Sequence, residues 1–193
     1  MNVFAYEIEY PMTTSTHPYT PEHHTVGTMR DSRIIALAPM TPEAATTLAP
    51  QIAGIGPWAH YNFQPETLHK AFLTTGDGAV RYQILIGDAP AGAVIVRSPW
   101  LAGPYLQMLA ILPSHQGGGI GKTFLDWYET TAHAAGIRMV WLCVTGVNTN
   151  AQRLYLRHGY TLAGHLADVI RDGDDELLMR KTLIGRNRAS TPA

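Results

Sequence analysis

A cluster of glycines between two apolar segments constrains this chain more than any other feature. Gly117, Gly118, Gly119 and Gly121 lie within five positions, shortly after the apolar run at residues 109–112. The run predicts a buried strand, and the apolar spacing after the glycines predicts a helix. The first N–H groups of a helix have no partner within it, and glycines let an anion approach them closely. The segment therefore predicts an anion site, with phosphate the favoured anion, and a tight turn without a ligand is the alternative.

Two common phosphate motifs do not describe this segment. Gly121, Lys122 and Thr123 resemble the end of a P-loop, but a P-loop needs a glycine where this chain has Gln116. In the dinucleotide fingerprint G-x-G-x-x-G, the third glycine would fall on Lys122 or Phe124. A nucleotide-binding P-loop protein therefore remains only as a rival hypothesis.

A third pattern, Q-x-x-G-x-G, is met by Gln116, Gly119 and Gly121. In this respect the chain resembles the GNAT superfamily of acyl-CoA-dependent N-acetyltransferases, in which the pattern holds the coenzyme's pyrophosphate. The run at residues 109–113 is similar to the family's fourth strand and the proline after it. The family's downstream pattern N-x-x-A-x-x-L-Y, then glycine and an aromatic, is met by Asn148, Ala151, Leu154, Tyr155, Gly159 and Tyr160. Together the motifs extend the resemblance over roughly residues 33–183.

The order of the expected elements agrees with this resemblance. Strands are predicted at residues 33–37, 80–86, 91–97, 105–112, 139–145, 161–170 and 176–183, and helices at about 42–52, 65–73, 119–135 and 148–157. Their alternation predicts an α/β sandwich around a mixed sheet. The resemblance implies a mostly antiparallel central sheet flanked by helices on both faces. The apolar strand at 105–112 is expected to be buried on both faces.

Composition and patterning predict one domain with two tails. The chain has 193 residues and is 46% hydrophobic, which is enough for one well-formed core. Residues 1–30 lack a sustained apolar period and predict a flexible N-terminal extension, with one short strand at 3–10. Residues 31–184 are expected to form the GNAT-like domain, and residues 185–193 a flexible C-terminal tail.

The resemblance implies acetyl-CoA as cosubstrate and no metal. Its pantetheine arm is expected to pair with the backbone of Leu109, Ala110 and Ile111, where the Ile111 N–H polarises the thioester carbonyl. The coenzyme-binding turn comprises Gln116, Gly117, Gly118, Gly119, Ile120, Gly121 and Lys122. Tyr155 resembles the family's general acid, because a neutral phenol can protonate the leaving thiolate. Asn148 is expected to contact the coenzyme, and either Asn148 or Asn150 caps the last helix.

The base that deprotonates the amine is less well defined. Some members carry a glutamate five residues before the motif asparagine, and this chain has Cys143 there. A buried neutral thiol is a poor base, so a small hydrophobic role is expected for Cys143. Glu66, His60, Asp168 or a water chain are the alternatives.

The resemblance implies two segments that shape the acceptor site, residues 54–65 and about 166–176. The first carries an aromatic cluster, Trp58, His60, Tyr61 and Phe63, which either packs an acceptor or covers the edge of the core. The second carries a run of acids that either attracts a cationic amine or is merely solvated: Asp168, Asp172, Asp174, Asp175 and Glu176.

These observations predict an N-acetyltransferase that transfers an acetyl or other short acyl group to a primary amine by direct attack in a ternary complex. The alternative is a non-catalytic acyl-CoA sensor of the same fold. The net charge of −1 predicts no nucleic-acid partner, and the absence of a long apolar run predicts no membrane contact. Cys143 is the only cysteine and no signal peptide is evident, so a cytoplasmic location is expected. His23 and His24 lack partners at metal-ligand spacing. Family members often dimerise, which allows a homodimer.

Overall fold

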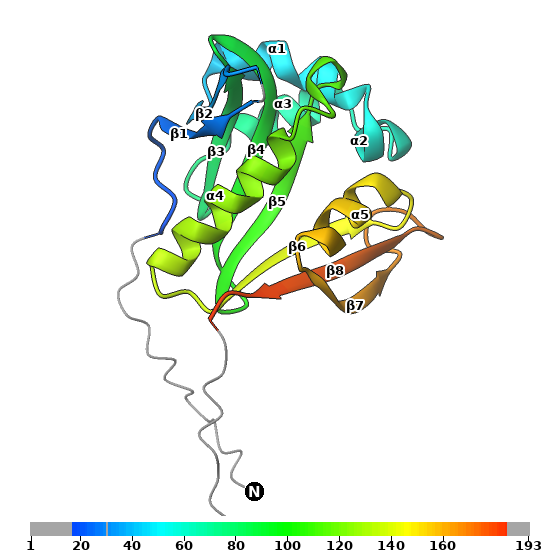
Figure 1. Ribbon diagram of the computed structural model, residues 1–193. Coiled ribbons are helices and arrows are strands. Elements are labelled where there is room, and N and C mark those ends of the chain that lie inside the picture. The colour runs from blue at the N-terminus through cyan, green and yellow to red at the C-terminus, as the bar shows by residue number, and fades with distance from the viewer. Residues whose placement is uncertain (1–16, 30, 185–193) are drawn as a thin grey trace, which may run out of the picture.

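The computed structural model describes residues 17–29 and 31–184, which form one mixed sheet with helices on both faces (Figure 1). Its eight strands follow the order β1-β2-β3-β4-β5-β6-β8-β7, and every neighbouring pair is antiparallel except β5 and β6. The strands are β1 (His24–Thr28), β2 (Ile34–Pro39), β3 (Ala79–Ile86), β4 (Ala89–Trp100), β5 (Gly103–Ile111), β6 (Met139–Thr145), β7 (Thr161–Ala167) and β8 (Asp175–Thr182). The expected mostly antiparallel α/β sheet is confirmed.

The helices begin at signals that are visible in the sequence. They are α1 (Pro42–Ala53), α2 (Gly56–His60), α3 (Pro65–Leu73), α4 (Ile120–Ala134) and α5 (Thr149–Arg157), with one 3-10 turn at Pro113–His115. Thr41 caps α1 by accepting the Ala44 N–H, and proline occupies its first turn. None of the helices in the described part of the chain is both long and apolar enough to cross a membrane.

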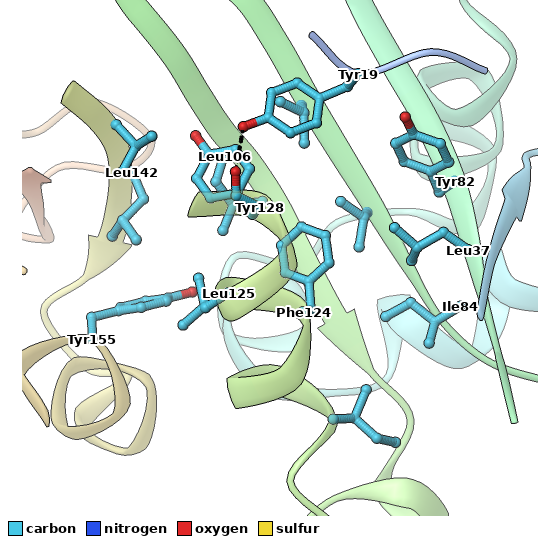
Figure 2. Packing of buried hydrophobic residues seen from close by; sticks show 14 of the residues in the cluster. Tyr19, Leu37, Tyr82, Ile84, Leu106, Phe124, Leu125, Tyr128, Leu142 and Tyr155 are labelled. Carbon is cyan, nitrogen blue, oxygen red and sulfur yellow. Dashed lines mark hydrogen bonds between the residues drawn. The ribbon is translucent and has the colours of Figure 1, made fainter. Parts of the chain in front are cut away.

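Alternation along the central strands creates two hydrophobic cores, one on each face of the sheet. Val94 and Val96 of β4 belong to the core cluster that includes buried residues of α4. Figure 2 shows Phe124, Leu125 and Tyr128 of this cluster. The intervening Ala93 and Ile95 pack with α1 and α3 on the other face. Because strand side chains alternate between faces, β4 is buried on both sides and lies at the centre of the molecule.

The feature that creates a site is the divergence of β5 from β6. The two strands pair in parallel only at Tyr105↔Trp141 and Leu106↔Leu142. Figure 1 shows them separating beyond this point, while β5 stays paired with β4 as far as Ile111. The part of β5 from residue 107 onward therefore has a free edge inside the sheet. Gln107 is exposed and Leu109 is half-buried, so the expected burial of this strand on both faces is wrong here.

Most predicted elements agree with the structure to within a few residues. The strand at Met139–Thr145 is confirmed at both ends, and β3 and β4 form a hairpin that turns at Gly87 and Asp88. The sequence did not predict α2, because Gly56 and Pro57 follow α1 closely and both residue types commonly end a helix. A proline in the first turn is equally compatible with the start of a helix.

The expected flexible extension is wrong for residues 17–29. Residues His24–Thr28 form β1, which pairs with β2, and Tyr19 is only 1% exposed. The Tyr19 ring stacks on Tyr128 at a centroid distance of 5.3 Å, and its hydroxyl donates to the Tyr128 carbonyl at 2.8 Å. A single anchoring tyrosine has no periodic signal in the sequence. The strand expected at residues 3–10 and the tail at 185–193 lie outside the described residues.

We expect Tyr19→Phe to lower the free energy of unfolding by about 1 kcal/mol, because it removes one buried hydrogen bond and keeps the ring. Urea denaturation at constant pH measures this change. His23→Ala, at an exposed position of the same segment, serves as control and should shift the value by less than about 0.5 kcal/mol. Equal stability of Tyr19→Phe and the wild type would contradict the anchoring role.

Candidate functional site

The free edge of β5 presents the backbone of alternate residues. The Leu112 N–H donates to the Ala91 carbonyl on β4 at 2.9 Å. Peptide groups of an antiparallel strand point alternately to its two sides, so those of Ala110 face β4 and those of Leu109 and Ile111 face the gap. The gap thus offers N–H and C=O groups to an extended ligand.

The glycine turn connects this edge to α4. Gly117 and Gly119 have φ of 78° and 85°, a left-handed conformation that glycine adopts without strain. A Cβ at Gly121 would lie 3.1 Å from the Leu154 side chain, so this glycine allows close packing of α4 on α5. Helix α4 begins at Ile120 without a side-chain cap. Its first N–H groups and the positive end of the helix dipole are available to an anion.

Gln116 joins the turn to the strand. Its side-chain amide donates to the Ile111 carbonyl at 2.8 Å, one of the groups that faces the gap. The side chain therefore fixes the glycine turn relative to the end of β5. This is a structural reason for the glutamine that opens the Q-x-x-G-x-G pattern.

A cleft of about 1020 Å³, named here the outer cleft, runs along these groups between β5, the glycine turn, α2 and α5. Its basic side chains are His115, Lys122, Arg153, Arg157 and His158. None of the described residues that line it is acidic. Lys122 also pairs with the exposed Asp126 at 2.7 Å. The outer cleft therefore carries positive charge along its walls and at the end of α4.

Tyr155 lies at the inner end of this cleft. Asn148 caps α5 by accepting the Ala151 N–H at 3.2 Å, which fixes the helix that carries Tyr155. The ring is 7% exposed and extends from α5 toward the buried side chains of α4 (Figure 2). Burial raises the pKa of Tyr155 to about 12. The phenol is therefore protonated throughout the neutral range and can donate its proton.

A second cavity of about 340 Å³, named here the inner chamber, adjoins the cleft. The two share Pro57, Trp58, Leu109, Asn148, Ala151 and Tyr155 as lining residues. The walls of the inner chamber include Tyr61, Phe63 and Tyr105. Among its described lining residues Glu176 is the only acid, and none is basic. The chamber is thus aromatic with a single carboxyl group.

Glu176 is the second residue of β8 and pairs with Thr145 of β6. The Tyr61 hydroxyl donates to Glu176 Oε1 at 2.8 Å and lies 2.7 Å from the Thr145 hydroxyl. Burial is the main cause that raises the pKa of Glu176 above 4.5, and the hydrogen bond from Tyr61 acts in the opposite direction. The sequence groups Glu176 with four other acids, and no local feature of the sequence distinguishes it from them.

The structure brings together most of the residues selected from sequence. Ten of the twelve predicted coenzyme and catalytic residues line the outer cleft: Leu109, Ile111, Gln116, Gly117, Gly119, Ile120, Gly121, Lys122, Asn148 and Tyr155. Ala110 is 1% exposed and turns its backbone to β4, and a Cβ at Gly118 would meet Met29. Neither of these two residues lines the cleft.

The candidates for a base are less well placed. Glu66, His60 and Asp168 line neither cavity. His60 contacts Asp174 at 3.1 Å instead, and Asp168 accepts the Gly173 N–H. Cys143 does line the inner chamber, where burial raises the pKa of its thiol. No group of three or more potential metal-binding side chains occurs in residues 17–29 and 31–184.

Comparison with known proteins agrees with this geometry. Residues 37–160 match the model of the Acetyltransferase (GNAT) family. Streptothricin acetyltransferase of Streptomyces lavendulae is 31% identical over 78 residues. The match covers 40% of this chain, and the chain spans only 41% of that relative's length. The crystal structure of nourseothricin acetyltransferase is 28% identical, with a TM-score of 0.50 over 55% of this chain and 66% of that one.

A further solved structure shares the fold alone. Aminoglycoside 6'-N-acetyltransferase complexed with coenzyme A is 14% identical, with a TM-score of 0.60 over 76% of this chain and 94% of that one. The match to the family model covers more of the sequence than the streptothricin acetyltransferase match does. It extends over well over half of the chain and includes β5, the glycine turn and α5. By this match, the chain belongs to the acetyltransferase (GNAT) family.

Proposed function

We propose that the protein is an N-acetyltransferase that moves an acetyl group from acetyl-CoA to a primary amine by direct attack in a ternary complex. The observation that carries the proposal is the contrast between two cavities that meet at Tyr155. The outer cleft is basic and suits a polyanionic coenzyme, whereas the inner chamber holds one acid and suits an amine. Membership of the family and a streptothricin acetyltransferase relative support the same activity.

In this proposal the pyrophosphate binds at the start of α4, on the N–H groups of the turn that ends at Lys122. The pantetheine arm extends along the free edge of β5, where the backbone groups of Leu109 and the N–H of Ile111 face the gap. Two observations support this fit: the helix end lacks a side-chain cap, and the cleft walls are basic. Acetyl-CoA supplies the thioester that is cleaved.

The catalytic roles follow from the positions of the groups. The Ile111 N–H faces the gap and can polarise the thioester carbonyl, so that charge developing on its oxygen is stabilised. The Tyr155 phenol is protonated at neutral pH and gives its proton to the departing sulfur. No covalent enzyme intermediate is required, because the amine reaches the carbonyl carbon directly from the inner chamber.

Calorimetry with acetyl-CoA and with ATP tests the coenzyme part of the proposal. We expect saturable binding of acetyl-CoA, and binding of ATP with no response to acetyl-CoA would overturn it. An acceptor panel then tests the activity by release of free thiol. The panel contains streptothricin, spermidine and an aminoglycoside, which are amines named by the relatives and structural neighbours.

The basic walls of the outer cleft give a second, milder prediction. Arg153 and Arg157 are exposed on successive turns of α5 and line the cleft. We expect the double variant Arg153→Ala, Arg157→Ala to weaken acetyl-CoA binding by about tenfold at low salt and by less at high salt. Arg138→Ala, at an exposed position that lines neither cavity, is the matched control. A salt-independent or absent effect would contradict an electrostatic role.

A further inference from the structure

The inner chamber contains one group that can carry charge at neutral pH. Cys143 and Tyr105 both line it, but burial raises the pKa of the thiol and of the phenol, so both are neutral. Tyr61 is likewise held protonated, since burial raises its pKa. Glu176 is therefore the one described lining residue of the chamber that can present a negative charge to a ligand.

The charged side chains around the chamber form ion pairs with one another and not with Glu176. Asp174 raises the pKa of Glu176 slightly, yet its carboxylate is bound by Arg171 at 2.6 Å and by His60 at 3.1 Å. Arg171 also lies over the Tyr61 ring at 5.7 Å. The titratable and charged groups near Glu176 are thus Tyr61 directly after α2, Tyr105 from β5 and Cys143 from β6. His60, Arg171 and Asp174 lie nearby in their own ion-pair cluster. No basic side chain among them takes the Glu176 carboxylate as a partner.

The hydrogen bonds of Glu176 hold it without neutralising it. Tyr61 donates to one carboxylate oxygen and is itself held by Thr145. A neutral donor fixes the orientation of the carboxylate while leaving its negative charge uncompensated. A buried charge of this kind is costly unless a ligand supplies its counter-charge. An ammonium group is the ligand that satisfies this requirement.

The shape of the chamber limits what carries the ammonium. Its volume of about 340 Å³ is at the lower end for ligand cavities. Trp58, Tyr61, Phe63 and Tyr105 line it, and aromatic faces attract organic cations. The chamber therefore suits a slim aminoalkyl arm better than a bulky ring.

We propose that Glu176 binds the ammonium group of the acceptor and takes its proton, and that the acceptor presents this ammonium on a slim alkyl arm. This inference rests on the proposed function. One N–H proton passes from the ammonium to the Glu176 carboxylate, and the freed lone pair forms the C–N bond as the C–S bond breaks. The sulfur receives the Tyr155 proton, the second N–H proton returns to the Tyr155 oxygen, and Glu176 releases its proton to solvent.

A binding experiment tests the site independently of turnover. Pentylamine is a cation at pH 7.5, and 1-pentanol is an uncharged molecule of the same length. NMR titration of the protein without coenzyme measures the affinity for each. We expect the wild type to bind the amine about tenfold more tightly than the alcohol. Asp172 is an exposed acid of the neighbouring turn, and Asp172→Asn serves as a control that should keep this preference. Glu176→Gln keeps an acceptor for Tyr61 and should lose the preference. Equal binding of amine and alcohol to the wild type would overturn the proposal.

The pH profile of acetyl transfer to streptothricin tests the proton transfer. In the wild type, kcat/KM should fall as pH decreases through the Glu176 pKa, which lies above 4.5. At pH 7.5 we expect Glu176→Gln to lower kcat/KM by about 100-fold, with the loss shrinking toward pH 10 because the amine then arrives already neutral. Glu176→Asp should recover part of the rate. A loss that is independent of pH would assign Glu176 a merely structural role.

The two proposals fail in different ways. A wild type that does not bind acetyl-CoA would overturn the proposed function, whatever the amine titration shows. Normal acetyl-CoA binding and turnover in Glu176→Gln at pH 7.5 would overturn the role of Glu176 alone.

Discussion

Replacing Tyr155 by phenylalanine is expected to lower kcat for acetyl transfer by about 1000-fold while the Kd for acetyl-CoA stays within about twofold. The substitution keeps the buried ring, which lies in the core cluster around α4, and removes only the hydroxyl. Without the phenol, the sulfur leaves as an unprotonated thiolate in a largely buried site. Stopped-time assays of thiol release with an amine of the acceptor panel that the wild type acetylates measure kcat, and calorimetry measures Kd.

Tyr160→Phe is the matched control for this variant. Tyr160 is 1% exposed and its ring contacts that of Tyr155 at a centroid distance of 5.8 Å, but it lines neither cavity. We expect its kcat to equal that of the wild type. Full activity of Tyr155→Phe would remove the tyrosine from the mechanism. Tight acetyl-CoA binding without turnover of any amine by the wild type would favour the sensor alternative.

The second large effect is expected at the glycine turn. Gly119→Trp should weaken acetyl-CoA binding by more than about 100-fold. Gly119 lines the outer cleft, and no protein atom lies within 4 Å of the position that a Cβ would take there. The indole would therefore enter the space at the start of α4 where we propose that the pyrophosphate binds. Calorimetry with acetyl-CoA measures the loss of affinity.

The loss of affinity caused by backbone strain has to be distinguished from the loss caused by the indole filling the cleft. Gly119 has a φ of 85°, where any L-residue is strained by roughly 1–2 kcal/mol. Gly136 follows the other end of α4 with a φ of 74° and has the same open space around a Cβ. Gly136→Trp therefore carries similar strain away from the cleft, and it should bind acetyl-CoA as the wild type does. Equal loss in both variants would attribute the effect to strain in α4.

The proposed coenzyme side of the site could be predicted from the sequence because its signals are local. Left-handed glycines, a helix start without a cap and the Asn148 cap are each determined by residues within a few positions of one another. The motifs that carried the resemblance consist of such features, and Gln116 and Ile111, which form a hydrogen bond, are only five positions apart. Ala110 and Gly118 were assigned with their neighbours because a motif does not reveal which way a peptide or Cβ points.

The acceptor side could not be read in this way. Glu176 and Tyr61 are 115 positions apart, and Tyr61 and Thr145 are 84 apart. Nothing in the local sequence separates Glu176 from the acids beside it. Its burial depends on the pairing of β8 with β6, and its partner Tyr61 is placed by α2, a helix that the sequence did not predict.

By itself the sequence determined the fold class, the order of the elements and the glycine turn, because periodicity, caps and φ preferences act over short distances along the chain. The tertiary structure alone decided that residues 17–29 belong to the domain, that β5 and β6 diverge, and that one carboxylate lines an aromatic chamber. These features arise where segments distant in sequence pack together. The burial of Tyr19 and of Glu176 is a property of that packing and has no counterpart in the residues adjacent to either of them.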